Sequence, residues 1–155
     1  DDTLWIDSQH LHNNSMVETI SIIDKDEYNI SNCQYLSTVD LSKLGKNNFV
    51  LKLNNCQLLQ KIIMPDSISN LSLVIEKCPN LQIHVTKGIG SLTIDAPNED
   101  LSVRVDPDVR NYVWYDKVLW NMDIFEVVYC FVPDKTEVLS KYFPQTASKV
   151  SSVGY

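Results

Sequence analysis

The sequence predicts a mainly-β solenoid, in which short strands stack as successive coils along one axis. Three cysteines, Cys33, Cys56 and Cys78, lie in similar contexts 23 and 22 residues apart, and a leucine follows each of them three residues later. Each of these leucines opens a short apolar run typical of a β-strand. A period of twenty-odd residues is typical of stacked repeats, because one coil cannot bury its apolar side without neighbours.

Two sets of strands are expected within the coils. The first set comprises five runs, which predict about five coils and lie at residues 17–22, 36–41, 59–64, 81–85 and 101–105. The second set shows alternating apolar residues in three coils, at residues 49–53, 71–75 and 92–94. Alternation with a period of two, in runs this short, favours strands over helices.

The whole chain, residues 1–155, is predicted to be a single solenoid domain whose ends depart from the repeat. Residues 1–14 are expected to form an N-terminal cap, in which residues 4–6 make a short strand that covers the first coil. Residues 15–108 carry the repeats, and residues 109–155 are expected to form a C-terminal cap. Caps that differ from the repeats are typical of solenoids, because the terminal coils must be shielded from water.

A short capping helix is predicted within the C-terminal cap. Asp134 and Glu137 have the spacing of a capping box, in which each side chain satisfies a free backbone amide at the start of a helix. The helix is expected to continue to Phe143 and to end at Pro144.

Composition and charge exclude several kinds of partner. Hydrophobic residues make up 44% of the 155-residue chain, which is enough for one core. The net charge of −7 argues against nucleic acid and against an anionic membrane surface, because both require an excess of Lys and Arg. No apolar run reaches the roughly 18–20 residues of a membrane span. The chain opens at Asp1 without a Met, which predicts a processed or trimmed product.

The cysteine pattern favours a structural role. The fourth cysteine is Cys130, and none of the four lies in a Cys-x-x-Cys pair, which argues against zinc and redox motifs. A cysteine that recurs at one position of a coil is best interpreted as a small buried hydrophobe in a ladder. A disulfide or metal site at this ladder stays open as the less favoured alternative, and no essential disulfide is expected.

The segment from Cys56 to Ile68 resembles the BspA-like leucine-rich repeat. It has Cys, Leu three residues on, apolar residues six and eight on, and then Pro-Asp-Ser-Ile. Cys33 and the apolar residues that follow it fit the same offsets. The resemblance implies a leucine-rich-repeat-like fold, export to a bacterial cell surface or secretion, a role in adhesion or binding, and no active site.

Outward-pointing residues of the first strand set are the main candidates for a binding site. In a strand, residues between buried positions point to the opposite face. The face that they form is mixed in charge, which suits a protein partner better than a polyanion; a face that is merely solvated is the competing interpretation. The predicted binding residues are Thr38, Asp40, Lys61, Ile63, Gln82, His84, Ser102 and Arg104.

An aromatic cluster in the C-terminal cap is the alternative candidate. Its members are Tyr112, Trp114, Tyr115 and Trp120, and stacked aromatic rings can bind sugars or the apolar side chain of a partner. This predicts carbohydrate binding as the second function. The competing and favoured interpretation is that these rings plug the open end of the solenoid core.

Metal and catalytic chemistry find little support in the sequence. His10 and His12 would lie on one side of a strand, with Glu18 as a possible neighbour, but no third and fourth ligands of defined geometry are evident. Acidic residues between Asp95 and Asp108 lack the spacing of calcium loops and are interpreted as a solvated rim. None of the three histidines has a neighbouring catalytic nucleophile motif. A non-catalytic protein without metal or cofactor is therefore expected; a pair of carboxylates for glycoside hydrolysis stays open.

Overall fold

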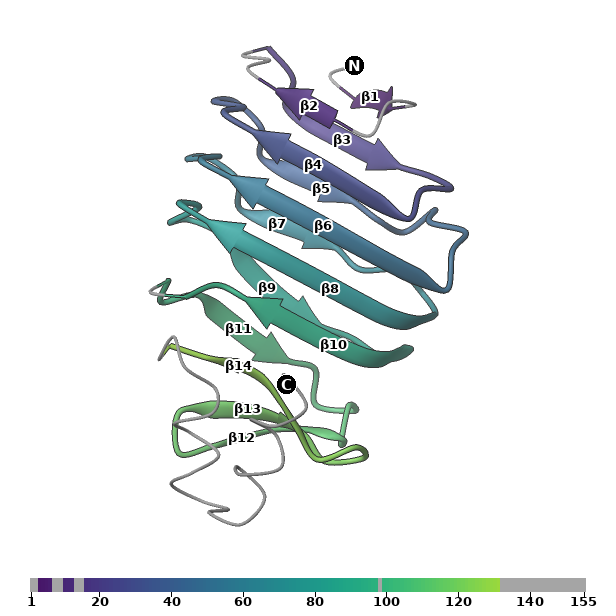
Figure 1. Ribbon diagram of the computed structural model, residues 1–155, viewed down its shortest axis with the longest axis vertical. Helices are drawn as coiled ribbons and strands as arrows, with labels where there is room; N and C mark the ends of the chain where they lie inside the picture. The colour runs from purple at the N-terminus through teal and green to yellow at the C-terminus, as the bar shows by residue number, and fades with distance from the viewer. Residues whose placement is uncertain (1–2, 7–9, 13–15, 98, 132–155) are drawn as a thin grey trace, which may run out of the picture.

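The computed structural model describes residues 3–6, 10–12, 16–97 and 99–131. This part of the chain is mainly β, contains no helix, and forms a β-solenoid of about 4 turns (Figure 1). Each turn places one strand in each of two parallel sheets, and the sheets face each other across the core. The solenoid prediction is confirmed, whereas the predicted helix over residues 134–143 lies outside the described residues.

Sheet A contains the first strand of each turn, in the order β1-β3-β5-β7-β9-β11, and all its strands are parallel. Its members are β1 (Thr3–Ile6), β3 (Thr19–Ile22), β5 (Thr38–Asp40), β7 (Lys61–Ile63), β9 (Gln82–Val85) and β11 (Ser102–Val105). All five predicted first strands and the predicted strand over residues 4–6 are therefore present.

Sheet B contains the second strand of each turn, in the order β2-β4-β6-β8-β10, and it too is parallel. Its members are β2 (His10–His12), β4 (Glu27–Ser31), β6 (Asn48–Asn54), β8 (Ile68–Glu76) and β10 (Ile89–Asp95). The prediction of five coils needs correction to about 4 turns. The fifth predicted coil supplies β11 to sheet A but, in the described residues, no strand to sheet B, because the chain turns after Val105 into a separate sheet.

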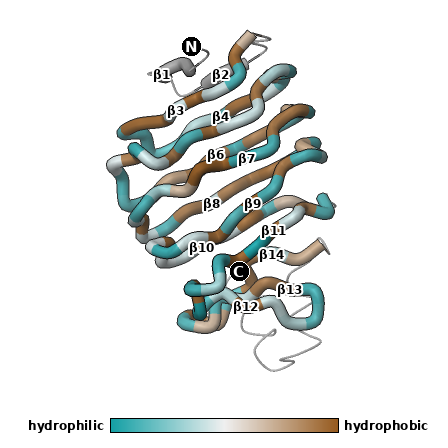
Figure 2. The backbone as a smooth tube through the Cα atoms, turned by 180° about the vertical axis from the view of Figure 1, so that it is seen from behind, coloured by the Kyte–Doolittle hydropathy of each residue, from teal (hydrophilic) through white to brown (hydrophobic). Residues whose placement is uncertain are grey.

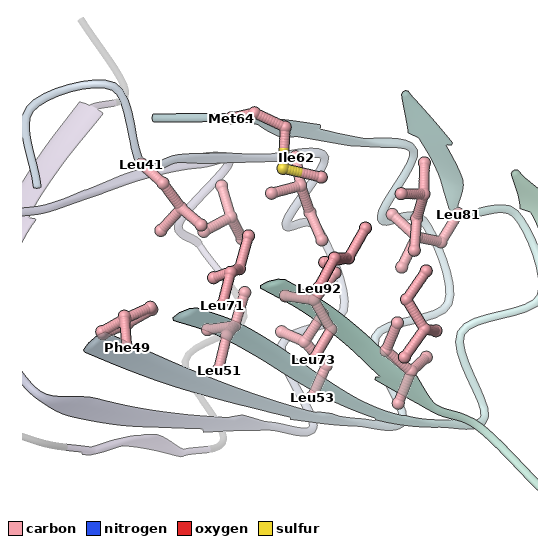
Figure 3. Packing of buried hydrophobic residues seen from close by; sticks show 14 of the residues in the cluster. Leu41, Phe49, Leu51, Leu53, Ile62, Met64, Leu71, Leu73, Leu81 and Leu92 are labelled. Atoms are coloured by element: carbon pink, nitrogen blue, oxygen red, sulfur yellow. The ribbon is translucent and has the colours of Figure 1, made fainter. Parts of the chain in front are cut away.

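Stacked apolar side chains fill the space between the two sheets (Figure 3). Leu51 on β6 pairs with Tyr28 on β4 and with Leu73 on β8, and all three side chains are fully buried. Ile62 and Met64 point toward Leu51 and Leu73 from the side of sheet A. Hydropathy alternates along the strands, and polar residues gather in the turns at the edges of the stack (Figure 2). This alternation is what directs one face of each strand inward.

The three repeated cysteines form the predicted buried ladder at the turn after β4, β6 and β8. Cys33, Cys56 and Cys78 form no disulfide and are fully buried. Each thiol donates to the backbone carbonyl two residues earlier, at distances of 3.5, 3.7 and 3.5 Å. The repeated geometry shows that the cysteine occupies one equivalent position in successive turns.

A left-handed residue precedes each of these cysteines. Asn32, Asn55 and Lys77 have φ angles of 56°, 57° and 56°. Asparagine tolerates this conformation better than most residues, because its short polar side chain bonds locally. The amide of Asn55 also donates to the side-chain oxygen of Asn32 at 2.9 Å, which joins neighbouring turns at the solvent side.

We expect the ladder thiols of the folded protein to react slowly with a thiol-labelling reagent at pH 8. All three thiols are fully buried, so a reagent has no access to them in the folded protein. Contact with the Cys33 thiol lowers the pKa of Cys56, but contact with Cys78 and burial raise it, to a net value of about 11. Few Cys56 thiolates therefore exist at pH 8, and the thiolate is the reactive form. Contact with Cys56 lowers the pKa of Cys78, so the protection of Cys78 rests on its burial. Mass spectrometry of the labelled native protein measures the rate, with the protein in denaturant as the fast control. Rapid native labelling of all three thiols would contradict the ladder.

A three-stranded antiparallel sheet, sheet C, closes the C-terminal end of the described stack (Figure 1). Its strands are β12 (Tyr112–Tyr115), β13 (Val118–Asn121) and β14 (Glu126–Cys130). Tyr112, Leu119, Val128 and Tyr129 join the solenoid core cluster. The Tyr112 hydroxyl donates to the carbonyl of Ile89 on β10 at 2.9 Å, which ties the sheet to the last turn.

Candidate binding face and groove

The outer face of sheet A carries the predicted binding residues in two rows. The register places Thr38, Lys61, Gln82 and Ser102 side by side in the first row. In the second row Asp40 lies beside Ile63, and His84 lies beside Arg104. None of the eight is buried, whereas Val39, Ile62 and Ile83 between them are buried in the core. The outward orientation expected from the alternation is therefore observed.

A groove of about 780 Å³ lies on this face over β7, β9 and β11. Five of the eight predicted residues line it, while Thr38, Asp40 and Ser102 lie outside its lining. The five are Lys61, Ile63, Gln82, His84 and Arg104. The volume lies within the range of sites that bind small ligands or short peptide segments.

The groove lies where the pairing of sheet A is weakest. In this fully described region, β7 and β9 are paired only at Lys61 and Gln82. The inward-facing residues Ile62 and Met64 contribute to the lining together with the outward-facing Ile63. The groove therefore reaches from the polar outer surface toward the apolar side chains at the end of β7.

Charges in the groove are unevenly paired. His84 Nε2 and Asp106 Oδ1 lie 3.2 Å apart, and both side chains are partly buried, with 40% and 37% exposed. Lys87 Nζ lies 3.5 Å from Asp108 Oδ2 at the rim. Lys61 and Arg104 make no ion pair with any residue in the described part of the chain. These two cations are exposed and available to a ligand.

Several lining residues were not predicted from the sequence. Most of them belong to the turns that follow β7, β9 and β11 rather than to the strands. The period-two pattern ends with each strand, so it carries no signal for the position of these side chains. Proximity in sequence to a candidate strand was the only feature that could have indicated these lining residues. The added residues are Gln60, Ile62, Met64, Pro65, Asp66, Thr86, Lys87 and Asp106.

The aromatic cluster is divided between the core and the surface. Tyr112 and Trp120 are buried, as expected for a plug, whereas Trp114 and Tyr115 are 41% and 64% exposed. The indole Nε1 of Trp114 donates to the carbonyl of Val103 at 3.1 Å, and adjacent strand residues point to opposite faces. The four rings therefore do not share one surface. Carbohydrate binding stays a prediction that rests on Trp114 and Tyr115 alone.

The other candidate ligands are dispersed. His10 and His12 lie on β2, as predicted, but their side chains lie outside the described part of the chain. Asp106 and Asp108 face His84 and Lys87, and a carboxylate oxygen of Glu99 accepts from the Lys77 amide at 2.7 Å. Among the described residues, no group of three or more His, Cys, Asp or Glu side chains could hold a metal ion.

Comparison with family models, with curated proteins and with solved structures finds no match for this chain. The resemblance to the BspA-like repeat therefore stays a prediction. No helix in the described residues has the length and apolar character needed to cross a membrane.

Proposed function

We propose that this chain is a non-catalytic binding module that presents the outer face of sheet A to a protein partner. The observation that carries this proposal is the groove over β7, β9 and β11, lined by five residues predicted independently from strand alternation. It combines a histidine, a glutamine and apolar side chains with two cations that form no ion pair with the described residues. A small number of convergent polar groups around an apolar floor is typical of recognition sites.

The pairing of β9 with β11 supports this use. These two strands are held in register through four residue pairs, which fixes Gln82, His84 and Arg104 relative to one another before binding. Pre-organisation reduces the entropy that association costs. The resemblance to BspA-like repeats extends the proposal to a leucine-rich-repeat-like adhesion protein, secreted or attached to a bacterial surface. Location and adhesion are parts of the proposal that rest on that resemblance.

We expect that replacing Lys61, His84 and Arg104 together by Ala will abolish partner capture and leave the fold intact. All three side chains lie on the outer face, so their removal leaves the core unchanged. Affinity purification from an extract of the source cells, followed by quantitative mass spectrometry, compares the triple variant with the original chain.

The matched control changes Lys52, Ser72 and Thr93 to Ala on the outer face of sheet B. It should retain every captured protein. Unchanged capture by the sheet A variant, together with loss in the sheet B variant, would place the interaction on the opposite face and contradict the proposal.

A further inference from the structure

We propose that the groove binds an extended acidic peptide segment that crosses β7, β9 and β11 and places one carboxylate on Lys61 and another on Arg104. This inference rests on the proposed function and specifies the chemistry of the partner. It starts from the charge balance of the groove rather than from that of the chain, whose net charge is −7.

Internal pairing leaves a specific pattern of charge in the groove. Asp106 is held by His84, and Lys87 by Asp108. Lys61, Arg104 and Asp66 make no ion pair with the described residues. Asp66 lies in the turn beyond β7, whereas Lys61 begins that strand. A ligand carboxylate is therefore attracted to the strand region of the groove and repelled at the turn.

The two cations have a spacing that matches an extended chain. Lys61 lies on β7 and Arg104 on β11, two strands apart, and neighbouring strands are roughly 4.8 Å apart. The separation across the sheet is therefore about 10 Å, and Arg104 lies two residues further along the strands than Lys61, which adds about 7 Å in the perpendicular direction. The two backbone positions are therefore about 12 Å apart. Side chains four residues apart in an extended peptide point to the same face and span about 13 Å, at about 3.3 Å per residue. Two acidic residues at positions i and i+4 would meet the two cations.

The middle of the groove suits the residues between these two carboxylates. Gln82 and His84 on β9 lie between the cationic strands and offer side-chain hydrogen bonds to a peptide backbone. Ile63 and the apolar surface at Met64 and Pro65 provide contact for one apolar side chain.

The number of cations argues for a short acidic segment over a polyanion. Nucleic acids and highly sulfated glycans gain their affinity from many simultaneous phosphate or sulfate contacts. Here two cations without an ion-pair partner among the described residues are surrounded by a protein of net charge −7, which repels a long polyanion. Two carboxylates match the site without extending beyond it.

The test uses two synthetic peptide libraries passed over the immobilised 155-residue chain. Both consist of acetylated octapeptides with random uncharged residues, except that positions three and seven are Glu in one library and Gln in the other. We expect retention of the Glu library to exceed that of the Gln library at least about tenfold, because charge-assisted hydrogen bonds are about twice as strong as neutral ones. Mass spectrometry quantifies the retained peptides.

Variants assign the binding to the groove. Lys61→Gln and Arg104→Gln should each reduce retention of the Glu library about tenfold, as expected for the loss of one desolvated charge contact. The matched controls are Lys52→Gln on sheet B and Arg110→Gln, the other arginine of the chain, which is outside the lining. Both should retain the library as the original chain does.

Each result separates this inference from the proposed function. Equal retention of both libraries, reduced by Lys61→Gln, would retain the binding face and overturn the acidic ligand. Failure to retain either library, while the sheet A triple variant still loses its captured protein, would also overturn only the acidic ligand. Displacement of the Glu library by a heparin oligosaccharide at lower concentration than by free acidic peptide would replace the peptide with a sulfated glycan. Capture that is insensitive to all changes on sheet A would overturn both.

Discussion

Replacing Gly88 by Ala is expected to destabilise the protein by about 2–6 kcal/mol, since a strained backbone and an overpacked contact each cost about 1–3 kcal/mol. Gly88 has a φ of +94°, where residues with a Cβ atom are disfavoured. A Cβ built there lies 2.0 Å from the backbone carbonyl oxygen of Asp66 in the preceding turn. The backbone of one turn must therefore move, and the Gly88 carbonyl would lose its 2.9 Å hydrogen bond from the Ile68 amide.

Gly45→Ala is the matched control for this change. Its backbone lies outside the left-handed region, and a Cβ there meets only the Asp24 carboxylate oxygen, at 4.0 Å. Stability should stay equal or rise by up to about 1 kcal/mol, because alanine restricts the unfolded chain. Urea unfolding followed by circular dichroism measures both variants. A Gly88→Ala protein within about 0.5 kcal/mol of the original would contradict the close contact between the two turns.

Leu51→Ala is expected to cost about 3 kcal/mol, within the range measured for buried leucines in well-packed cores. Leu51 is fully buried in the middle of sheet B and pairs with Tyr28 and Leu73. Its removal leaves a cavity that two turns share, and the parallel sheets hold those turns in register, so the cavity cannot collapse easily. The midpoint and slope of urea unfolding give the change in free energy.

The adjacent Lys52→Ala provides the comparison on the same strand. Its side chain points outward and lies 3.8 Å from Glu27 in a half-exposed ion pair, which contributes little in water. A change within about 0.5 kcal/mol is expected. If Lys52→Ala were the more destabilising change, β6 would have to be shifted by one residue from the register described above.

The periodic part of the fold follows from local sequence. A cysteine with a leucine three residues on marks each turn, and alternating apolar residues assign the strands to inner and outer faces. The end of the repeat was harder to predict, because residues 101–105 have the pattern of a first strand although no sheet B strand follows in the described residues. Whether the chain continues a turn or leaves it depends on tertiary packing, here on the contact of Tyr112 with β10.

The candidate site, like the fold, could be predicted only in part from the sequence. Strand alternation predicted Lys61, His84 and Arg104 on the outer face. It did not predict that Thr38 and Ser102 would fall outside the groove, because both obey the same pattern. The groove depends on the limited pairing between β7 and β9, which involves residues distant in sequence. The partnership of His84 with Asp106 likewise joins two turns, and periodicity within one turn carries no information about it.

The unequal pairing of the third and fourth turns has a mechanical consequence. On sheet B, β8 and β10 are joined through six residue pairs, whereas on sheet A β7 and β9 are joined through one. Under a bending load the connection between the third and fourth turns is therefore stiff at sheet B and compliant at sheet A. It acts as a hinge whose axis runs along sheet B. A ligand bound from Lys61 to Arg104 spans the compliant side as a brace. Tension along the solenoid axis would then act directly on the strands that line the binding groove.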